Sequence, residues 1–118
     1  MAEGPVDLKV RTKRFALRII RLSASLPSTQ PAWVIGKQIL RSGTSVGAHY
    51  REGCRARSDA EFISKLEGSL QELEETAYWL ELLVEGEIVS KERLADLCKE
   101  ADELTAILVT CVKKAKGL

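Results

Sequence analysis

The feature that most constrains the fold is a stripe of apolar residues, spaced three and four apart, that recurs in four successive segments. The third segment shows it most clearly, with apolar residues at steps of 4, 3, 4, 3 and 4 from Leu66 to Val84. This spacing places the residues on one face of an α-helix. Nothing in the sequence alternates between apolar and polar residues over a useful length. The sequence therefore predicts an all-α protein without strands.

The other three segments carry comparable stripes, which we expect to form the core. The stripes are Leu8, Phe15, Ile19, Leu22 and Leu26 in the first segment, Leu66, Leu70, Leu73, Ala77, Leu80 and Val84 in the third, and Leu94, Leu97, Ala101, Leu104, Leu108, Cys111 and Ala115 in the fourth. The second helix is expected to run through Trp33, Ile35, Ile39, Val46 and Tyr50.

Turn-forming and capping residues separate the four segments. Pro27 and Pro31 bracket polar residues, and a proline such as Pro31 suits the first turn of a helix. Gly86 is placed to end the third helix in the left-handed conformation, and Ser90 can cap the fourth.

The sequence Ser58–Glu61, "SDAE", predicts a capping box at the start of the third helix. The Ser58 hydroxyl can accept a hydrogen bond from the Glu61 amide, while the Glu61 carboxylate reaches back to the amide of Ser58. We expect helices over about residues 5–26, 31–57, 59–86 and 91–116 of a single domain, residues 1–118. Four helices joined by short turns fold most simply as an antiparallel up-down-up-down bundle.

Length and cysteine content narrow the class of protein. A chain of 118 residues suits one core, and it has no apolar run near the roughly 20 residues that span a bilayer. The N-terminal residues lack the apolar stretch of a secretory signal. Cys54, Cys98 and Cys111 are odd in number and form no CxxC pair, which indicates reduced thiols. We expect a cytoplasmic protein without a membrane partner.

Charge is divided unequally along the chain. Residues 1–57 carry 11 Lys/Arg and 3 Asp/Glu, a net charge of +8, whereas residues 58–118 carry 7 and 14, a net charge of −7. This division favours either a nucleic-acid-binding face on the basic half or pairing between basic and acidic helices, within one chain or between chains.

Basic residues of the first half follow helical spacing. Four arginines of the first helix step by 3, 4 and 3, and two further basic pairs stand four residues apart in the second helix. Such stripes could neutralise phosphates without reading bases, so RNA or DNA is the candidate ligand. The candidate contacts are Arg11, Arg14, Arg18, Arg21, Lys37, Arg41, Arg51 and Arg55. The alternative is that these side chains pair with glutamates of the third and fourth helices.

The second helix also has a face with little side-chain bulk. Gly43 and Gly47 are separated by three residues, with no Gly-Lys after them and no strand before them, so they do not form a P-loop. Each glycine inside a helix costs about 1 kcal/mol relative to alanine, which a close contact must offset. This contact is either with a helix of the same bundle or with another subunit, and both alternatives stay open. The candidate residues are Gly36, Gly43, Gly47, Ala48 and His49.

His49 is the one histidine of the chain. The surrounding "AHYREG" is superficially similar to the A-H-x-L-K-G pattern of histidine phosphotransfer domains, but Glu52 replaces the lysine and would repel a phosphoryl group. A di-iron bundle requires two Glu-x-x-His pairs, and a hydrolase requires a nucleophile, a base and an orienting group together. We therefore expect no catalysis, no metal and no cofactor, with phosphotransfer through His49 a distant third hypothesis for function.

A longer motif, Gln38 to Leu83, resembles bacterial four-helix-bundle proteins encoded in intervening sequences of 23S rRNA genes. The resemblance covers about 46 residues and has His49 where the family usually has asparagine. The matching residues are Arg41, Ser45, Val46, Ala48, Glu52, Gly53, Arg57, Ser58, Glu61, Phe62, Leu66, Ser69, Leu70, Glu72 and Glu74.

This resemblance implies an antiparallel four-helix bundle that assembles into a closed ring, typically a homopentamer. The accessory protein of diversity-generating retroelements is similar in fold, is pentameric and works with a reverse transcriptase and its RNA. A ring needs two different surfaces that meet, which suits a chain with a basic and an acidic half. We expect a non-catalytic, ring-forming bundle that binds nucleic acid or a nucleoprotein through its basic half. The alternative is a structural oligomer or protein adaptor without affinity for nucleic acid.

Overall fold

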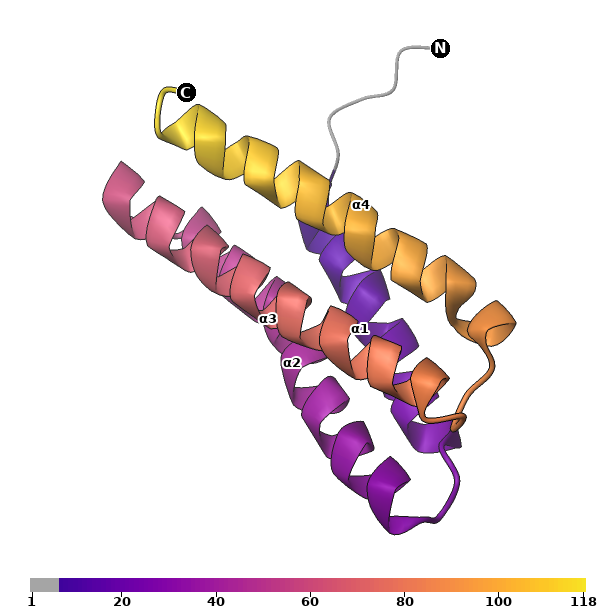
Figure 1. The fold of residues 1–118 in the computed structure, drawn as a ribbon. Helices are drawn as coiled ribbons and strands as arrows, with labels where there is room; N and C mark the ends of the chain where they lie inside the picture. The colour runs from indigo at the N-terminus through magenta and orange to yellow at the C-terminus, as the bar shows by residue number, and fades with distance from the viewer. Residues whose placement is uncertain (1–6) are drawn as a thin grey trace.

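The computed structural model describes residues 7–118, and these form four α-helices without strands. Figure 1 shows the helices lying side by side as a helical bundle, which confirms the predicted all-α class. The helices are α1 (Leu8–Ser25), α2 (Gln30–Cys54), α3 (Asp59–Glu85) and α4 (Lys91–Ala115). The sequence prediction extended the second helix to residue 57, but α2 ends at Cys54. Residues 5 and 6 of the predicted first helix lie outside the described residues.

Side-chain caps start all four helices. The predicted caps of α3 and α4 are confirmed, since the Glu61 amide donates to Ser58 Oγ at 3.1 Å and the Arg93 amide to Ser90 Oγ at 3.3 Å. The second half of the predicted capping box is wrong in one detail. The Glu61 carboxylate accepts from the Arg57 amide at 3.0 Å and not from the amide of Ser58.

The end of α3 differs from the prediction. Gly86 caps the helix with φ −79°, so it is not in the left-handed conformation. The left-handed residue is the next one, Glu87, with φ 60°. The Glu87 amide donates to Val84 O and the Ile88 amide to Leu83 O, at 3.0 and 2.9 Å. This is the hydrogen-bond pattern of a Schellman motif, with a glutamate at the position where glycine is usual.

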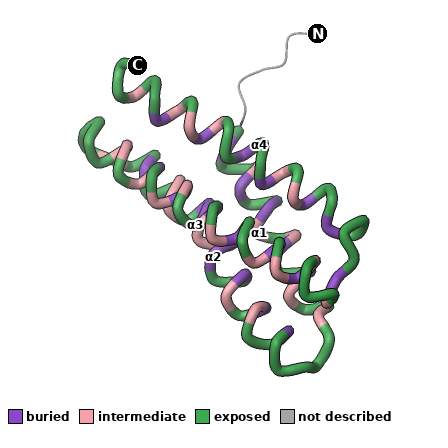
Figure 2. Tube along the Cα trace, viewed as in Figure 1, coloured by how far each residue is buried: buried purple, intermediate pink, exposed green. Residues whose placement is uncertain are grey.

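One continuous core runs between the helices (Figure 2). The predicted stripes of α1 and α4 are mostly buried, although Leu26 and Cys111 are only half-buried. The largest fully buried side chains come from all four helices and are Phe15, Ile19, Ile39, Val46, Leu66, Leu73, Leu80, Leu83, Leu104 and Leu108, with Thr12 and Thr76.

The apolar spacing predicted the buried face of α3 only in part, because three of its six positions are buried. Leu70 is only half-buried and Ala77 is exposed, whereas Ser69 and Thr76 are buried. Their hydroxyls explain this placement, because Ser69 Oγ donates to Val46 O and Thr76 Oγ1 is hydrogen-bonded to Ser42 Oγ, both at 2.8 Å. A hydroxyl that finds a partner can be buried at little cost. Small polar residues therefore form part of the contact between α2 and α3.

Polar contacts join α1 to α4. The Arg11 guanidinium makes two hydrogen bonds of 2.8 Å to the carboxylate of Glu100, and Arg93 Nη2 donates to Ser25 Oγ at 2.6 Å.

None of the four helices described for residues 7–118 has both the length and the apolar character that a membrane span requires.

Candidate nucleic-acid interface

Two of the eight predicted nucleic-acid contacts are engaged with carboxylates of the same chain. Arg11 contacts Glu100 and also Glu103, whose Oε1 lies 2.8 Å from Arg11 Nη2. The hydrogen bond to Glu100 is the largest cause of a raised pKa of Arg11 and of a lowered pKa of Glu100. The Arg11 side chain is only 27 % exposed. Arg11 Nε and Nη2 are therefore already engaged with carboxylates of the same chain.

Arg41 is held in the same way on the other side of the molecule. Its guanidinium forms hydrogen bonds to Glu75 and, at 3.3 Å, to Glu72. The hydrogen bond to Glu75 is the main cause of a raised pKa of Arg41, and Arg41 in turn lowers the pKa of Glu75. Trp79 Nε1 also donates to Glu75, at 3.2 Å. This cluster links α2 to α3.

Three other candidates lie on α2 or directly after it, each with different neighbours. Arg51 Nη2 donates to the carbonyl of Lys9 at 3.4 Å, which directs this side chain towards α1. Lys37 lies over the ring of Trp33, with Nζ 4.5 Å from the ring centroid. Arg55 is the exposed residue that follows the last turn of α2.

Arg14, Arg18 and Arg21 form the basic stripe, a name used here for these three residues. Within residues 7–118, none of the three is in a salt bridge. Arg14 and Arg21 are exposed and Arg18 is half-buried. All three line shallow cavities between α1 and α4. Of the predicted residues, the basic stripe is the set that the fold leaves together and available to an anion.

Arg93 belongs to the same surface but was missed by the sequence analysis. It lies in the acidic half of the chain, in the first turn of α4. Together with Arg18 and Arg21 it lines a cavity of about 250 Å³. The order and directions of the helices could have pointed to Arg93. In a bundle with short connections, the start of the fourth helix is near the end of the first if the two run in opposite directions.

Gly36, Gly43 and Gly47 of α2 face α1 and the residue that follows it in the same chain, whereas Gly53 faces α3. A Cβ at residue 43 would lie 2.7 Å from Cγ1 of Ile19, and one at residue 47 would lie 2.9 Å from Oγ1 of Thr12. At Gly36, the nearest atom would be Cδ1 of Leu26, at 3.1 Å. The space over these three glycines is thus filled by α1 and Leu26. Ala48 is exposed and lies outside this contact.

His49 lies between two carboxylates at the contact of α2 with α3. Its Nδ1 is 3.7 Å from Glu52 Oε1, and its Nε2 is 3.7 Å from Glu72 Oε2. Gly68 of α3 makes room for the ring, since a Cβ there would lie 3.3 Å from Nδ1. Residues 7–118 hold no group of three or more His, Cys, Asp or Glu that could hold a metal. The arrangement suits a helix contact better than the binding of a phosphoryl group.

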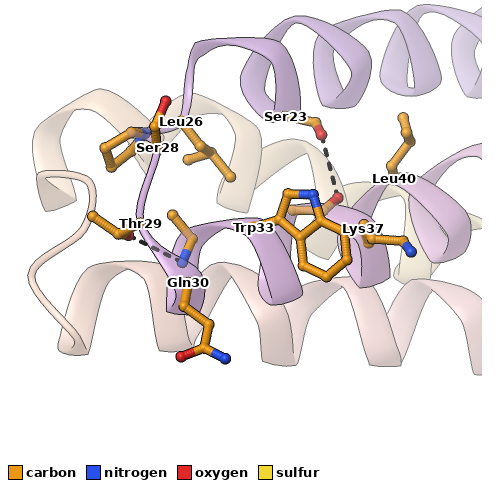
Figure 3. Close-up of a pocket in the computed structure, with 11 residues that line it drawn as sticks. Ser23, Leu26, Ser28, Thr29, Gln30, Trp33, Lys37 and Leu40 are labelled. Atoms are coloured by element: carbon orange, nitrogen blue, oxygen red, sulfur yellow. Dashed lines mark hydrogen bonds between the residues drawn. The ribbon is translucent and has the colours of Figure 1, made fainter.

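A pocket of about 570 Å³ lies at the turn between α1 and α2 (Figure 3). Trp33 lines this pocket and is 63 % exposed. Ser23 Oγ donates to Gly36 O at 3.2 Å across the pocket's inner side. Leu40 is also exposed, and Lys37 covers one face of the indole. This apolar surface suits a contact with another protein.

Comparison with known families identifies the chain at the level of a family. A model described as 23S rRNA-intervening sequence protein matches residues 6–110. A crystal structure of a protein with unknown function from the S23 ribosomal protein family of Bacteroides thetaiotaomicron is similar, with a TM-score of 0.85 and 42% sequence identity. The similarity covers 90% of this chain and 98% of that one. Curated proteins give no significant match. The chain belongs to the 23S rRNA-intervening sequence protein family.

Proposed function

We propose that this protein is a non-catalytic, ring-forming four-helix bundle that binds nucleic acid through α1. The observation that carries the proposal is the contrast among the arginines of α1. Arg11 is engaged with Glu100, whereas the basic stripe has no salt bridge within residues 7–118. Unpaired arginines repel each other, and a row of phosphates would offset that repulsion.

The proposal narrows the interface to one side of the bundle. Arg14, Arg18 and Arg21 recur at helical spacing and line cavities along the contact of α1 with α4. Such a stripe contacts backbone phosphates and has no element that enters a groove to read bases. We therefore expect binding with little preference for sequence.

A binding titration tests this function. Fluorescence anisotropy of labelled RNA and DNA is measured with the purified protein at about 50 mM and about 200 mM salt. The proposal expects binding at the lower salt concentration that weakens at the higher one. Absence of binding to both nucleic acids at the lower concentration would overturn it.

The proposed topology is antiparallel up-down-up-down, and pairs of contacts support it. Along α1, Thr12, Ile19 and Ser23 contact α2 at Gly47, Gly43 and Gly36, in reverse order of sequence. Along α4 the order also reverses, because Arg11 contacts Glu100 while Ser25 contacts Arg93.

Assembly into a ring, most simply a pentamer, is proposed from the family resemblance together with the exposed apolar residues. Several large apolar side chains of α1 and α2 are at least 37 % exposed, and a neighbouring subunit would cover them. They are Val10, Leu17, Ile20, Trp33, Val34 and Leu40.

We also propose that the protein has no catalytic activity and is located in the cytoplasm. His49 is flanked by Glu52 and Glu72, which disfavour phosphorylation at its ring nitrogens. The three cysteines are free, in keeping with a reducing compartment.

The alternative function is a structural oligomer or protein adaptor without affinity for nucleic acid. The exposed Trp33 beside the α1–α2 pocket favours it, because exposed aromatic residues are common anchors of protein contacts. Pull-down from native lysate, with and without nuclease, separates the two functions. Partners retained after nuclease treatment support the adaptor, and partners lost with the nucleic acid support the proposed function.

A further inference from the structure

Arg18, Arg21 and Arg93 line one small cavity. It lies where the end of α1 is near the start of α4, two helices that Figure 1 labels. The remaining lining residues are apolar: Leu22, Leu94 and Leu97. Within residues 7–118, none of the three arginines is in a salt bridge. The cavity therefore gathers three positive charges over an apolar floor, and no carboxylate of the described chain lines it.

Arg93 is held in position from both helices. Its Nη2 donates to Ser25 Oγ at 2.6 Å, and Ser25 Oγ donates in turn to Leu22 O at 2.8 Å. Its backbone amide donates to Ser90 Oγ, so Arg93 also lies in the capped first turn of α4. The positive end of a helix dipole adds to the field at this place. A side chain that is already ordered loses less entropy when it binds a ligand.

We propose that this three-arginine cavity binds a phosphate group of the nucleic-acid backbone. Guanidinium groups match the oxygens of phosphate through paired N–H donors. The cavity of about 250 Å³ is smaller than the 300–1,000 Å³ of usual small-molecule sites, which favours a single anionic group over a whole nucleotide. The site joins a residue of the acidic half to the basic stripe, and the inference rests on the proposed nucleic-acid binding.

The first arm of the test compares Arg93→Gln with Lys91→Gln in RNA binding by fluorescence anisotropy. Lys91 is a matched control, because it is exposed, two residues away and lines a different cavity, between α3 and α4. Loss of one charge-assisted phosphate contact should weaken RNA binding by about tenfold in Arg93→Gln. Lys91→Gln should change it much less. Arg93→Lys should restore part of the affinity, because lysine keeps the charge without the fork of donors.

The second arm uses inorganic pyrophosphate as a probe of the cavity itself. Pyrophosphate should compete with RNA, and it should raise the melting temperature of the wild type more than that of Arg93→Gln. Circular dichroism establishes that each variant keeps its helices. The Ser25→Ala variant keeps the Arg93 charge but removes the hydrogen bond that holds it, and it should show an intermediate loss of RNA affinity.

The outcomes separate this inference from the proposed function. If wild type binds RNA but Arg93→Gln and Lys91→Gln bind it equally well, the phosphate site is wrong and the proposed function stands. If pyrophosphate stabilises wild type more than Arg93→Gln but wild type binds no RNA, the cavity is a site for a small anion. The proposed nucleic-acid binding is then wrong. If neither ligand binds, both are overturned.

Discussion

Ile19 of α1 lies so close to Gly43 of α2 that a Cβ on residue 43 would stand 2.7 Å from its Cγ1 and 2.8 Å from its Cγ2. Both atoms belong to a side chain that is fully buried and stiff at its branch. Gly43→Ala should gain about 1 kcal/mol in helix propensity but lose about 1–3 kcal/mol by overpacking. We expect a net loss of unfolding free energy, measured by urea denaturation.

Gly68→Ala is the matched control for this variant. The added Cβ would meet only the half-exposed ring of His49, at 3.3 Å, and a small rotation of that ring relieves the contact. This control should be neutral or stabilising. Equal stability of the two alanine variants would contradict the tight packing of α2 on α1.

Glu87 offers a stabilising substitution, because it holds φ 60° after the end of α3. A left-handed conformation costs a residue with a side chain about 1 kcal/mol more than it costs glycine. Glu87→Gly should therefore raise the melting temperature. Glu85→Gly, inside the last turn of α3, should lower it by a similar free energy. If Glu87→Gly is the less stable variant of the two, the Schellman ending of α3 is wrong.

The sequence predicted the helices better than their contacts. Apolar spacing located the cores of α1 and α4, and cap chemistry located Ser58 and Ser90. On α3 the spacing located Leu66, Leu73 and Leu80 but missed two buried polar residues. That helix packs on both α2 and α4, and its contact with α2 uses Ser69 and Thr76. From sequence alone, serine and threonine are expected at the surface. The oxygen atoms that Ser69 and Thr76 contact on α2 explain why these two residues are buried.

The sequence predicted which arginines could bind nucleic acid, but not which of them share one surface in the folded chain. Helical spacing cannot tell Arg11, which meets Glu100 across 89 residues of sequence, from Arg14, which has no salt bridge within residues 7–118. Arg93 was missed for the opposite reason. It lies in the acidic half of the chain, near Glu92 and Asp96, whereas in space it shares a cavity with Arg18 and Arg21.

The ion pair between Arg11 and Glu100 should make stability depend on pH. The hydrogen bond from Arg11 holds the pKa of Glu100 below its ordinary value in the folded protein. A lowered folded-state pKa contributes stability that is present above the unfolded pKa and is lost as pH falls through the folded pKa. Glu100→Gln should thus cost stability at about pH 7, and the difference from wild type should shrink towards about pH 3. Urea denaturation at both pH values measures it, and a difference that grows on acidification would contradict the pairing.

Oligomeric state is measurable by multi-angle light scattering. Wild type should show the mass of a closed oligomer, most simply five chains. Trp33→Ser with Leu40→Ser should reduce that mass while circular dichroism stays helical, because both side chains are exposed on the isolated chain. Lys99→Gln is a neutral control on α4. A monomeric mass of wild type at micromolar concentration would contradict the ring.

The central claim is that the basic stripe binds nucleic-acid phosphates. Its most direct test is the slope of log binding constant against log salt concentration for RNA, with wild type and with Arg14, Arg18 and Arg21 all changed to Gln. A control changes Lys99, Lys113 and Lys114 to Gln, which removes the same charge from exposed positions of α4. Three lost phosphate contacts should reduce the slope by about 2 to 3, since each contact contributes about 0.7–0.9. Only the arginine variant is expected to show a much shallower salt dependence and weaker binding of RNA. Equal slopes for the arginine and lysine variants would contradict it.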